Sequence, residues 1–402
     1  MKYNFISNRV KNIKPSPTIA VTSKARELKA AGKDIIGLGA GEPDFDTPSH
    51  IKNSAIDAIQ KGKTKYTAVD GIPELKNAIC EKFLRDNKIK YNLNEVSVSA
   101  GGKQVLFNAL LATISKGDEV IIPAPYWVSY PDMVVLAEGV PIIIETNVKN
   151  NFKVSASQLR EKINTNTKWI IINSPSNPTG SCYSDDELQE IGKILDDFPN
   201  LGIISDDIYE KIIYDNFKFT TIASLFPQYK ERILTVNGVS KAYSMTGWRI
   251  GYAGGSEEII KSMAKIQSQS TTNPSSISQA AAVEALNGVQ DFISIRSKAF
   301  EERRDFVVNS LNSIDGINCL KPDGAFYVFP SCKALIGKKD KNGKKIENDT
   351  DFVQSLLENN GIAVVQGSAF GLDGFFRISY ATSMDNLEKA MKRIKDFCES
   401  LS

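Results

Sequence analysis

The sequence predicts an α/β protein in which a three-layer domain, built on a mostly parallel sheet, is joined to a smaller α+β domain. Three observations support this prediction. From residue 95 onward, short runs rich in Ile and Val alternate with helical stretches, which is typical of a parallel sheet covered on both faces. The last hundred residues instead mix short strands with helices. Polar side chains gather where the apolar runs end, and open parallel sheets bind ligands at that edge.

Composition narrows the function classes. The 402 residues allow two or three domains of common size, and 49 basic against 47 acidic residues leave too little positive charge for a broad nucleic-acid-binding surface. The five cysteines are far apart without a CxxC pair and His50 is the only histidine, so neither a disulfide framework nor a metal site is expected. Because no apolar run could span a membrane and the N-terminus has no signal-peptide pattern, we expect a cytoplasmic protein.

The first third of the chain is predicted to be mostly helical. Residues 1–33 form a basic arm that ends in a short helix. The elements expected here are a helix at 22–31, a strand at 34–38 and helices at 48–60 and 73–87. The glycine-rich loop after the strand is not a dinucleotide fingerprint, because Glu42 occupies a position that requires glycine. Asp57 excludes a phosphate-binding P-loop around Gly62 for the same reason.

The middle of the chain alternates strands and helices. Strands are expected at 95–99, 119–122, 141–145, 168–173, 201–205, 232–237 and 248–253. A helix is expected from Ala100 to about Ile114, and Ser184 and Glu187 form a capping box that begins another helix. Helices then dominate from about residue 256 to 313. This order of apolar strands and helices predicts the parallel sheet.

The C-terminal part is predicted to form the second domain. Short strands are expected at 325–329, 362–365 and 375–379, and helices at 349–360 and 385–400. The lysine-rich stretch 338–345 is interpreted as a solvated loop. We divide the chain into an arm with part of the small domain (1–47), a large domain (48–300) and a small C-terminal domain (301–402).

Lys241 is the first candidate catalytic residue. It follows the apolar run 232–237, where a buried ammonium is costly unless it is paired or used chemically. A desolvated lysine can become an amine nucleophile, the starting point of Schiff-base chemistry. Arg249, a permanent cation, and Ser240 could hold a phosphate beside it. Because a lone lysine after a strand is usually exposed, the assignment depends on the other strand ends.

Those strand ends supply complementary groups. Gly102 and Lys103 open a helix whose amides could bind an anion, although two adjacent glycines also suit an ordinary turn. Asp206 ends an apolar strand and should face the crevice while Asp207 faces out; a helix N-cap is the plainer alternative. Trp127 could stack on a planar ring or pack in the core.

Arg377 and Asn177 complete the set. Arg377 lies in an apolar strand with no nearby acid, which favours a ligand carboxylate gripped by two hydrogen bonds. The Asn177–Pro178 bond is a candidate cis peptide that would place the Asn177 amide. An amine, a phosphate cradle, a buried acid, a stacking surface and a carboxylate clamp together fit pyridoxal 5′-phosphate.

With these residues identified, the chain resembles the class I/II aminotransferases of fold type I. It is most similar to the subgroup of bacterial aspartate aminotransferases that includes the aspartate/prephenate enzymes. The resemblance covers nearly the whole chain, and any one of its motifs is modest support. The motifs occur in order at 9–10, 14–16, 40–48, 62–66, 125–131, 173–180, 240–252 and 376–383.

The resemblance implies roles for individual residues. Lys241 would attach the cofactor covalently and then act as the base that moves the substrate's α-proton. Asp206 would pair with the ring nitrogen, and Tyr209 and Asn177 would bind the ring's phenolic oxygen. The phosphate would be held by Gly102, Lys103, Ser240 and Arg249, and the substrate by Gly41, Trp127, Asn177, Arg377 and Lys14. Tyr66 would reach the neighbouring subunit's cofactor, which implies a homodimer with shared active sites.

The implied reaction moves the amino group between L-aspartate or L-glutamate and the 2-oxo acids oxaloacetate or 2-oxoglutarate, with prephenate to arogenate as an extension. Segment 268–273 lacks the arginine that better-known aspartate aminotransferases use for the distal carboxylate, so Lys103 or Lys14 would replace it. Either Tyr126 or Trp127 could stack on the ring. The alternatives are another amino-acid specificity, such as aromatic acids or alanine, and a fold-type I lyase. A regulatory protein is disfavoured because the N-terminal arm is too short for a DNA-binding domain.

Overall fold

The computed structural model describes residues 5–15 and 17–402, so Ser16 of the 14–16 motif lies outside the described residues. The strands are β1 (Ile36–Gly37), β2 (Val96–Ser99), β3 (Glu119–Ala124), β4 (Val140–Glu145), β5 (Thr167–Asn173), β6 (Gly202–Asp206), β7 (Ile233–Gly238), β8 (Gly251–Gly254), β9 (Tyr327–Val328), β10 (Ile362–Ala363), β11 (Val365–Gln366) and β12 (Phe376–Ser379). The α-helices are α1 (Asn8–Asn12), α2 (Pro17–Ala30), α3 (Ser49–Gln60), α4 (Pro73–Asn87), α5 (Gly102–Thr113), α6 (Tyr130–Leu136), α7 (Ala156–Lys162), α8 (Asp185–Gly192), α9 (Ile194–Asp197), α10 (Ile222–Leu225), α11 (Glu257–Ser268), α12 (Ser276–Asn287), α13 (Asp291–Asn312), α14 (Asp349–Asn360) and α15 (Met384–Glu399).

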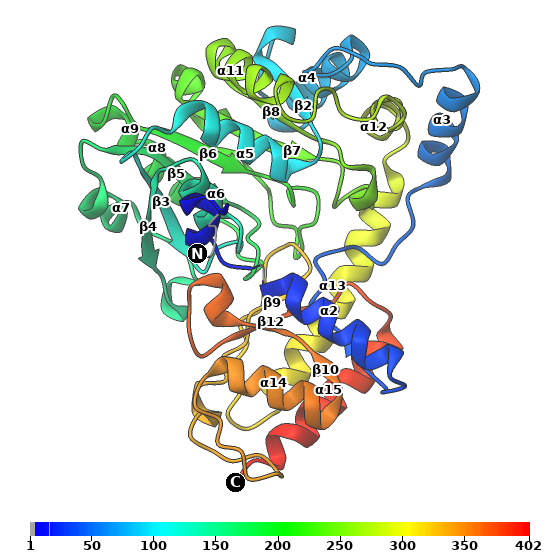
Figure 1. Ribbon diagram of the computed structural model, residues 1–402, viewed down its shortest axis with the longest axis vertical. Helices are drawn as coiled ribbons and strands as arrows, with labels where there is room; N and C mark the ends of the chain where they lie inside the picture. The colour runs from blue at the N-terminus through cyan, green and yellow to red at the C-terminus, as the bar shows by residue number, and fades with distance from the viewer. Residues whose placement is uncertain (1–4, 16) are drawn as a thin grey trace.

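A seven-stranded sheet with the order β2-β8-β7-β6-β5-β3-β4 organises the larger body (Figure 1). Neighbouring strands from β7 to β4 pair in parallel, and β8 is antiparallel to both β7 and β2. As a result β2 runs in the same direction as β7, and every strand except β8 ends at one edge of the sheet. The predicted α/β fold with a mostly parallel sheet is confirmed.

Both faces of this sheet are buried, which explains the continuous apolar runs of the sequence. Along β5, Trp169 and Ile171 pack in a core with α5, α6 and α11. Ile170 and Ile172 point to the opposite face, into a core with α3, α4, α8 and α12. Helix, sheet and helix therefore form three layers. The capping box of Ser184 and Glu187 begins α8 as predicted.

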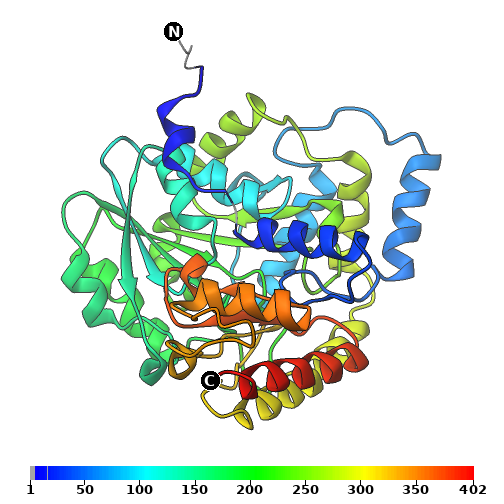
Figure 2. The same cartoon turned by 60° about the horizontal axis from the view of Figure 1, so that its bottom comes forward.

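A second body contains the three-stranded antiparallel sheet β11-β12-β9 and a core made largely by α13, α14 and α15. The N-terminal segment joins it, because β1 pairs in parallel with β10 through Ile36 and Ile362. Helix α13 runs from one body to the other, and α2, α14 and α15 lie on the second body (Figure 1, Figure 2). The division at residues 47 and 300 stays a prediction. In the described part of the chain, no helix is long and apolar enough to cross a bilayer.

The structure corrects two local expectations. The strand predicted from Trp248 begins only at Gly251, because Thr246–Trp248 form a 3₁₀ turn and Arg249 adopts the left-handed conformation (φ 56°). A non-glycine residue with this φ cannot continue a strand. The Asn177–Pro178 bond is not cis; the cis bonds of the described residues precede Pro125 and Pro175.

The centre of the sheet gives a stability prediction. Ile203 of β6 lies between β5 and β7 and is fully buried in the core of the α3, α4, α8 and α12 face. Ile203→Ala should lower the free energy of unfolding by about 2–5 kcal/mol, and Ile203→Val by about 0.5–1.5 kcal/mol. Denaturant unfolding of both variants without added cofactor measures this graded loss. Equal effects of the two substitutions would contradict the assigned packing.

Candidate active site

A cavity of about 500 Å³ lies at the edge where the strands of the large sheet end. One wall comes from the sheet and its following turns, and the other from α2, β9 and β12. Most of the predicted site residues line it: Gly41, Gly102, Lys103, Trp127, Asn177, Asp206, Tyr209, Ser240, Lys241, Arg249 and Arg377. The strand register explains this convergence, since residues separated by as many as 336 positions, from Gly41 to Arg377, follow the ends of adjacent strands or face them from the second body.

One end of the cavity is built to bind an anion. Strand register pairs Gly251 with both Ser99 and Gly238, so the residue preceding β8 lies beside the start of α5. The Arg249 guanidinium donates to the carbonyls of Thr246 (2.9 Å) and Ala100 (3.3 Å). No carboxylate of the described residues pairs with Arg249. A permanent cation and the N-terminus of a 12-residue helix therefore face the same space.

Glycine is required at the turn before α5. Gly101 has φ +90°, and a Cβ at this position would overlap the Arg249 guanidinium. Ser240, which follows β7, adds a hydroxyl to the cavity lining on the same side. The close approach of backbone and guanidinium is what leaves the amides of α5 facing the cavity. This end can hold a phosphate group.

Lys241 lies on the cavity floor. Its ammonium donates to the Gly41 carbonyl at 2.6 Å and sits 5.6 Å from the centre of the Tyr209 ring. Burial lowers the pKa of the Lys241 amine to about 8, and the positive charge of Arg377 acts in the same direction. A substantial fraction of this amine is therefore neutral near physiological pH, which is the form that attacks a carbonyl or takes a proton.

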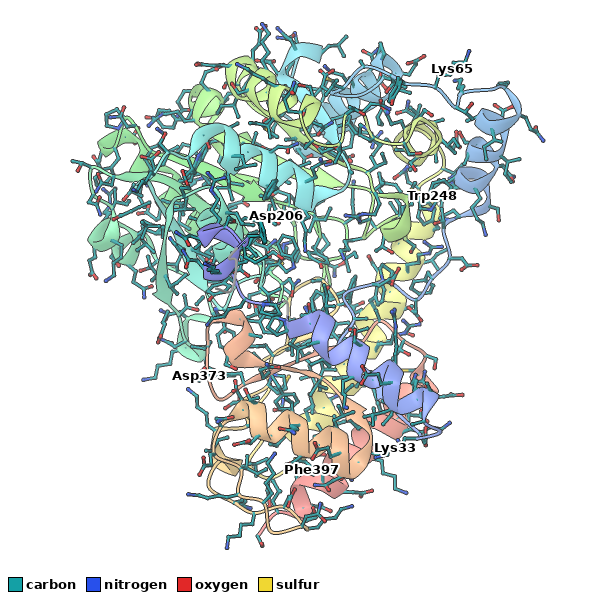
Figure 3. The ribbon with its side chains drawn as sticks, viewed as in Figure 1. Lys33, Lys65, Asp206, Trp248, Asp373 and Phe397 are labelled. Atoms are coloured by element: carbon teal, nitrogen blue, oxygen red, sulfur yellow. The ribbon has the colours of Figure 1, made fainter. Side chains whose placement is uncertain are left out.

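Asp206 is held by a residue that the sequence did not indicate. Figure 3 labels Asp206 in the body formed by the large sheet, where it ends β6. The Tyr130 hydroxyl donates to its Oδ2 at 2.6 Å, and the Ile208 amide approaches Oδ1 at 3.4 Å. Burial raises the pKa of Asp206, and the hydrogen bond from Tyr130 opposes that rise. A cationic ring N–H in the cavity would stabilise the carboxylate further.

The structure corrects the expectation that Asp207 faces outward. Its side chain points away from the cavity but is only 1% exposed, and it accepts a hydrogen bond from the Ser205 hydroxyl at 2.7 Å. Burial raises the pKa of Asp207 to about 7. The segment is covered on both sides, because the opposite face of the sheet carries its own helices. Alternation along the strand thus predicted the direction of the side chain but not its burial.

Arg377 is a preorganised carboxylate receptor. It lies on β12 and is 2% exposed. Its guanidinium donates to Asn177 Oδ1 (2.8 Å) and to the Gly39 carbonyl (2.6 Å), and it stacks 4.6 Å from the Tyr327 ring. Among the described residues no acid pairs with it, and its Nε has no hydrogen-bond partner. A buried guanidinium with an unused donor favours an anionic ligand.

Trp127 lines the cavity and Tyr126 does not. The Tyr126 ring abuts Gly371 outside the site, and its amide donates to the Phe370 carbonyl. The Lys103 ammonium lies 5.0 Å from the centre of the Trp127 ring. Burial lowers the pKa of Lys103, with a contribution from Arg249, and no acid of the described chain pairs with it. Lys103, like Arg377, is therefore a cation available to bind an anionic group of a ligand.

Two predicted residues lie elsewhere. Tyr66 is 88% exposed, in the loop between α3 and α4, where Figure 3 labels its neighbour Lys65 at the outer edge of the molecule. Lys14 is exposed, lies beside Asp132 at the start of α6 and is not part of the cavity lining. Neither residue reaches the cavity of its own chain in this structure.

The sequence reasoning missed several lining residues. Tyr130 is the first residue of α6, and its distance of three positions from Trp127 was the one signal in the sequence that it could lie near the cavity. Tyr327 donates or accepts a hydrogen bond with the Tyr209 hydroxyl at 2.8 Å, and only the fold brings these two together. The side formed by α2 consists of residues at helical spacing: Thr18, Ile19, Thr22, Ser23 and Arg26.

Comparison with known proteins agrees with this geometry. The sequence matches the family described as aminotransferase class I and II over residues 33–394. An aspartate/prephenate aminotransferase of Cereibacter sphaeroides is 56% identical, over 99% of this chain and 100% of that protein. The crystal structure of the aspartate aminotransferase from Rhizobium meliloti superposes with a TM-score of 0.97, at 52% identity and with 100% of both chains covered.

A more distant structure has the same fold. The aspartate aminotransferase of Thermus thermophilus with maleate superposes with a TM-score of 0.92, at 41% identity over 98% of this chain and 100% of that one. The family match and the structural superpositions therefore agree over nearly the whole chain. The protein belongs to the class I and II aminotransferase family.

Proposed function

We propose that this protein uses pyridoxal 5′-phosphate to transfer the amino group between L-aspartate or L-glutamate and their 2-oxo acids, and that prephenate is a further acceptor. The proposal rests on one observation: a single cavity is lined by Lys241, Asp206, Arg249 and Arg377. Relatives 56% and 57% identical over nearly the whole chain bear the name aspartate/prephenate aminotransferase, one of them as a probable assignment. The dual substrate range is taken from those relatives.

The residues of the cavity fit the cofactor. Its phosphate matches the cation of Arg249 and the amides at the start of α5, and its ring nitrogen matches the buried Asp206 carboxylate. When bound, pyridoxal 5′-phosphate supplies an aldehyde that takes up the amino group and a ring that withdraws electrons from the substrate's Cα. Trp127 would offer a flat surface to the ring, and Tyr209 and Asn177 would donate to its phenolic oxygen.

Lys241 would both hold the cofactor and move a proton. Its amine, with a pKa lowered to about 8 by burial, is neutral often enough to attach to the aldehyde. The same nitrogen, when not attached to the cofactor, would be placed to take the proton from the substrate's Cα. The Gly41 carbonyl, which accepts from Lys241 at 2.6 Å, would keep the freed ammonium in place.

Two cations are left for the substrate's carboxylates. Arg377 would grip the α-carboxylate, since Asn177 and Gly39 already hold its guanidinium in position. Lys103 is the better supported residue for the distal carboxylate, because it lines the cavity and lacks an acid partner in the described chain, whereas Lys14 lies outside. The Thermus relative was solved with maleate, which like aspartate carries two carboxylates.

We also propose a homodimer with shared active sites. Tyr66 is almost fully exposed and remote from the cavity of its own chain, yet the family resemblance assigns it to a cofactor phosphate. If Tyr66 contacted the cofactor of a second copy of the chain, its exposed position and its expected role would be consistent with each other. Such a contact would also cover exposed apolar side chains of α3 such as Ile56 and Ile59.

The first prediction tests the function itself. Protein loaded with pyridoxal 5′-phosphate should show a near-ultraviolet to visible absorption band that shifts on adding aspartate, and should form glutamate from 2-oxoglutarate. Lys241→Ala should lack the band and lose about 10²–10⁴-fold or more in rate, because it removes both the attachment point and the base. Lys193→Ala, which alters an exposed lysine between α8 and α9, is the matched control. Release of ammonia or pyruvate in the absence of a 2-oxo acid acceptor would identify a lyase instead.

The second prediction concerns pH. In the cofactor-free protein, reductive labelling of Lys241 by a small aldehyde should rise with pH and reach half its maximum near pH 8, because burial lowers the pKa of this amine to about 8. Exposed lysines should reach theirs near pH 10.5, so at pH 7 Lys241 should react about two orders of magnitude faster. Peptide mass spectrometry measures both. A midpoint for Lys241 at or above pH 10 would refute its desolvation.

The third prediction concerns Tyr130. Tyr130→Phe removes a hydrogen bond to a buried carboxylate, worth about 1.5–3 kcal/mol, so kcat/KM should fall about 10–100-fold. The pKa of Asp206 should rise further, which moves the acidic limb of the pH–rate profile to higher pH. Tyr91→Phe is the control, since Tyr91 is also buried and its hydroxyl hydrogen-bonds the Thr235 hydroxyl, not a carboxylate, at 3.2 Å. Equal effects of the two substitutions would show that Tyr130 acts only on stability.

A further inference from the structure

The segment 206–211 has two faces with different partners. Asp206 and Tyr209 line the cavity, while Asp207 and Glu210 point to the opposite side and are buried. The segment is neither helix nor strand beyond Asp206; its backbone is held by turns such as the Glu210 amide to the Asp207 carbonyl at 3.0 Å. Strand pairing with Asn173 and Val236 fixes the backbone of Asp206. Beyond it, turns alone leave side-chain positions loosely defined, so the contacts on the buried face help to decide where the cavity face lies.

A closed set of buried polar groups holds Glu210. Its carboxylate forms an ion pair with Lys82 of α4, and the Asn87 amide donates to Glu210 Oε2 at 2.7 Å. Lys82 in turn donates to Asn87 Oδ1 at 2.6 Å. The side chains of Lys82 and Glu210 are only 2% and 5% exposed. Each of the three residues contacts the other two, which restricts Glu210 in direction as well as in distance.

The next residue is tied to the same helix. Lys211 forms an ion pair with Asp86 at 2.9 Å. Lys82 and Asp86 occupy positions i and i+4 and therefore share one side of the last turns of α4, and Asn87 is the last residue of that helix. That helix is fixed by core residues such as Leu75, Ile79 and Phe83, which are fully buried. The segment thus rests on a rigid element rather than on another loop.

A buried ion pair is a poor device for stability alone, because desolvation of the two charges offsets much of their attraction. What it provides is a specific arrangement, since any displacement of one partner leaves the other charge buried and unpaired. We propose that Lys82 and Glu210 are positioning residues: their ion pair holds the segment that presents Asp206 and Tyr209, and so sets the affinity for the cofactor. This inference rests on the proposed function, which assigns those two residues to the cofactor.

The test compares cofactor affinity with stability. Lys82→Met should raise the dissociation constant for pyridoxal 5′-phosphate, measured by titrating the full-length cofactor-free protein, by about 10–100-fold. It should also reduce the rise in Tm that the cofactor gives. Lys82→Arg, which keeps the charge, should restore the affinity to within about threefold of wild type. An unchanged dissociation constant in Lys82→Met, together with a lowered Tm, would overturn the proposal.

Two further variants separate the alternatives. Lys230→Met removes an ion pair with the mostly buried Glu95, which lies outside the segment, and should lower Tm without changing the dissociation constant. If Lys82→Met does not fold, the double variant Lys82→Met with Glu210→Met removes both buried charges and should regain stability. Its cofactor affinity should stay below that of wild type, and equal affinity would overturn the positioning role. Wild-type protein that fails to bind the cofactor would instead refute the proposed function itself.

Discussion

The pairing of β8 between β2 and β7 is the constraint on which the site depends. Because β8 runs against both neighbours, β2 points the same way as β7, and the turn after β2 meets the turn before β8. Gly251 faces Ser99 on one side and Gly238 on the other, so the start of α5, Arg249 and Lys241 lie around one point. The parallel strands β5 and β6 end at the same edge and add Asn173 and Asp206.

The electrostatics of the cavity follow from this convergence. The cationic lining residues are Arg26, Lys103, Lys241, Arg249 and Arg377, and the acidic ones are Glu42 and Asp206. Burial disfavours the charged amines and so lowers the pKa of Lys241 and of Lys103, and the neighbouring cations Arg377 and Arg249 add to this effect. An excess of positive charge in a partly desolvated space is unfavourable until anions bind. A phosphate and two carboxylates would balance these charges. The same imbalance that costs stability therefore favours an anionic cofactor and dicarboxylic substrates.

Two packed elements approach the reacting groups from opposite sides. The sheet and its helices hold Asp206 from behind, through the Tyr130 hydroxyl and through the buried contacts of Glu210 with α4. The second body brings Arg377 and Tyr327 on short antiparallel strands whose positions are set by the pairing of β12 with β9 and β11. The Tyr209–Tyr327 hydrogen bond and the contact of Arg377 with Asn177 join the two sides. The cavity is thus an interface between two cores.

The sheet, the ends of its strands and the main candidate residues could be predicted from the amino-acid sequence alone. Apolar runs buried on both faces and polar residues directly after them are local patterns, and they pointed to Lys241, Asp206, Arg249 and Arg377, which the structure brings to one cavity. Other features became visible only in the folded chain: Trp127 rather than Tyr126 faces the cavity, Tyr130 holds Asp206, and Asp207 is buried. The fold also places Lys14 and Tyr66 away from the cavity of their own chain. Each of these depends on contacts between segments far apart in the chain, such as the 76 positions between Tyr130 and Asp206. Residue type and spacing indicate what kind of partner a side chain requires, such as an anion or a hydrogen-bond donor. Which residue becomes that partner depends on how the two cores pack against each other.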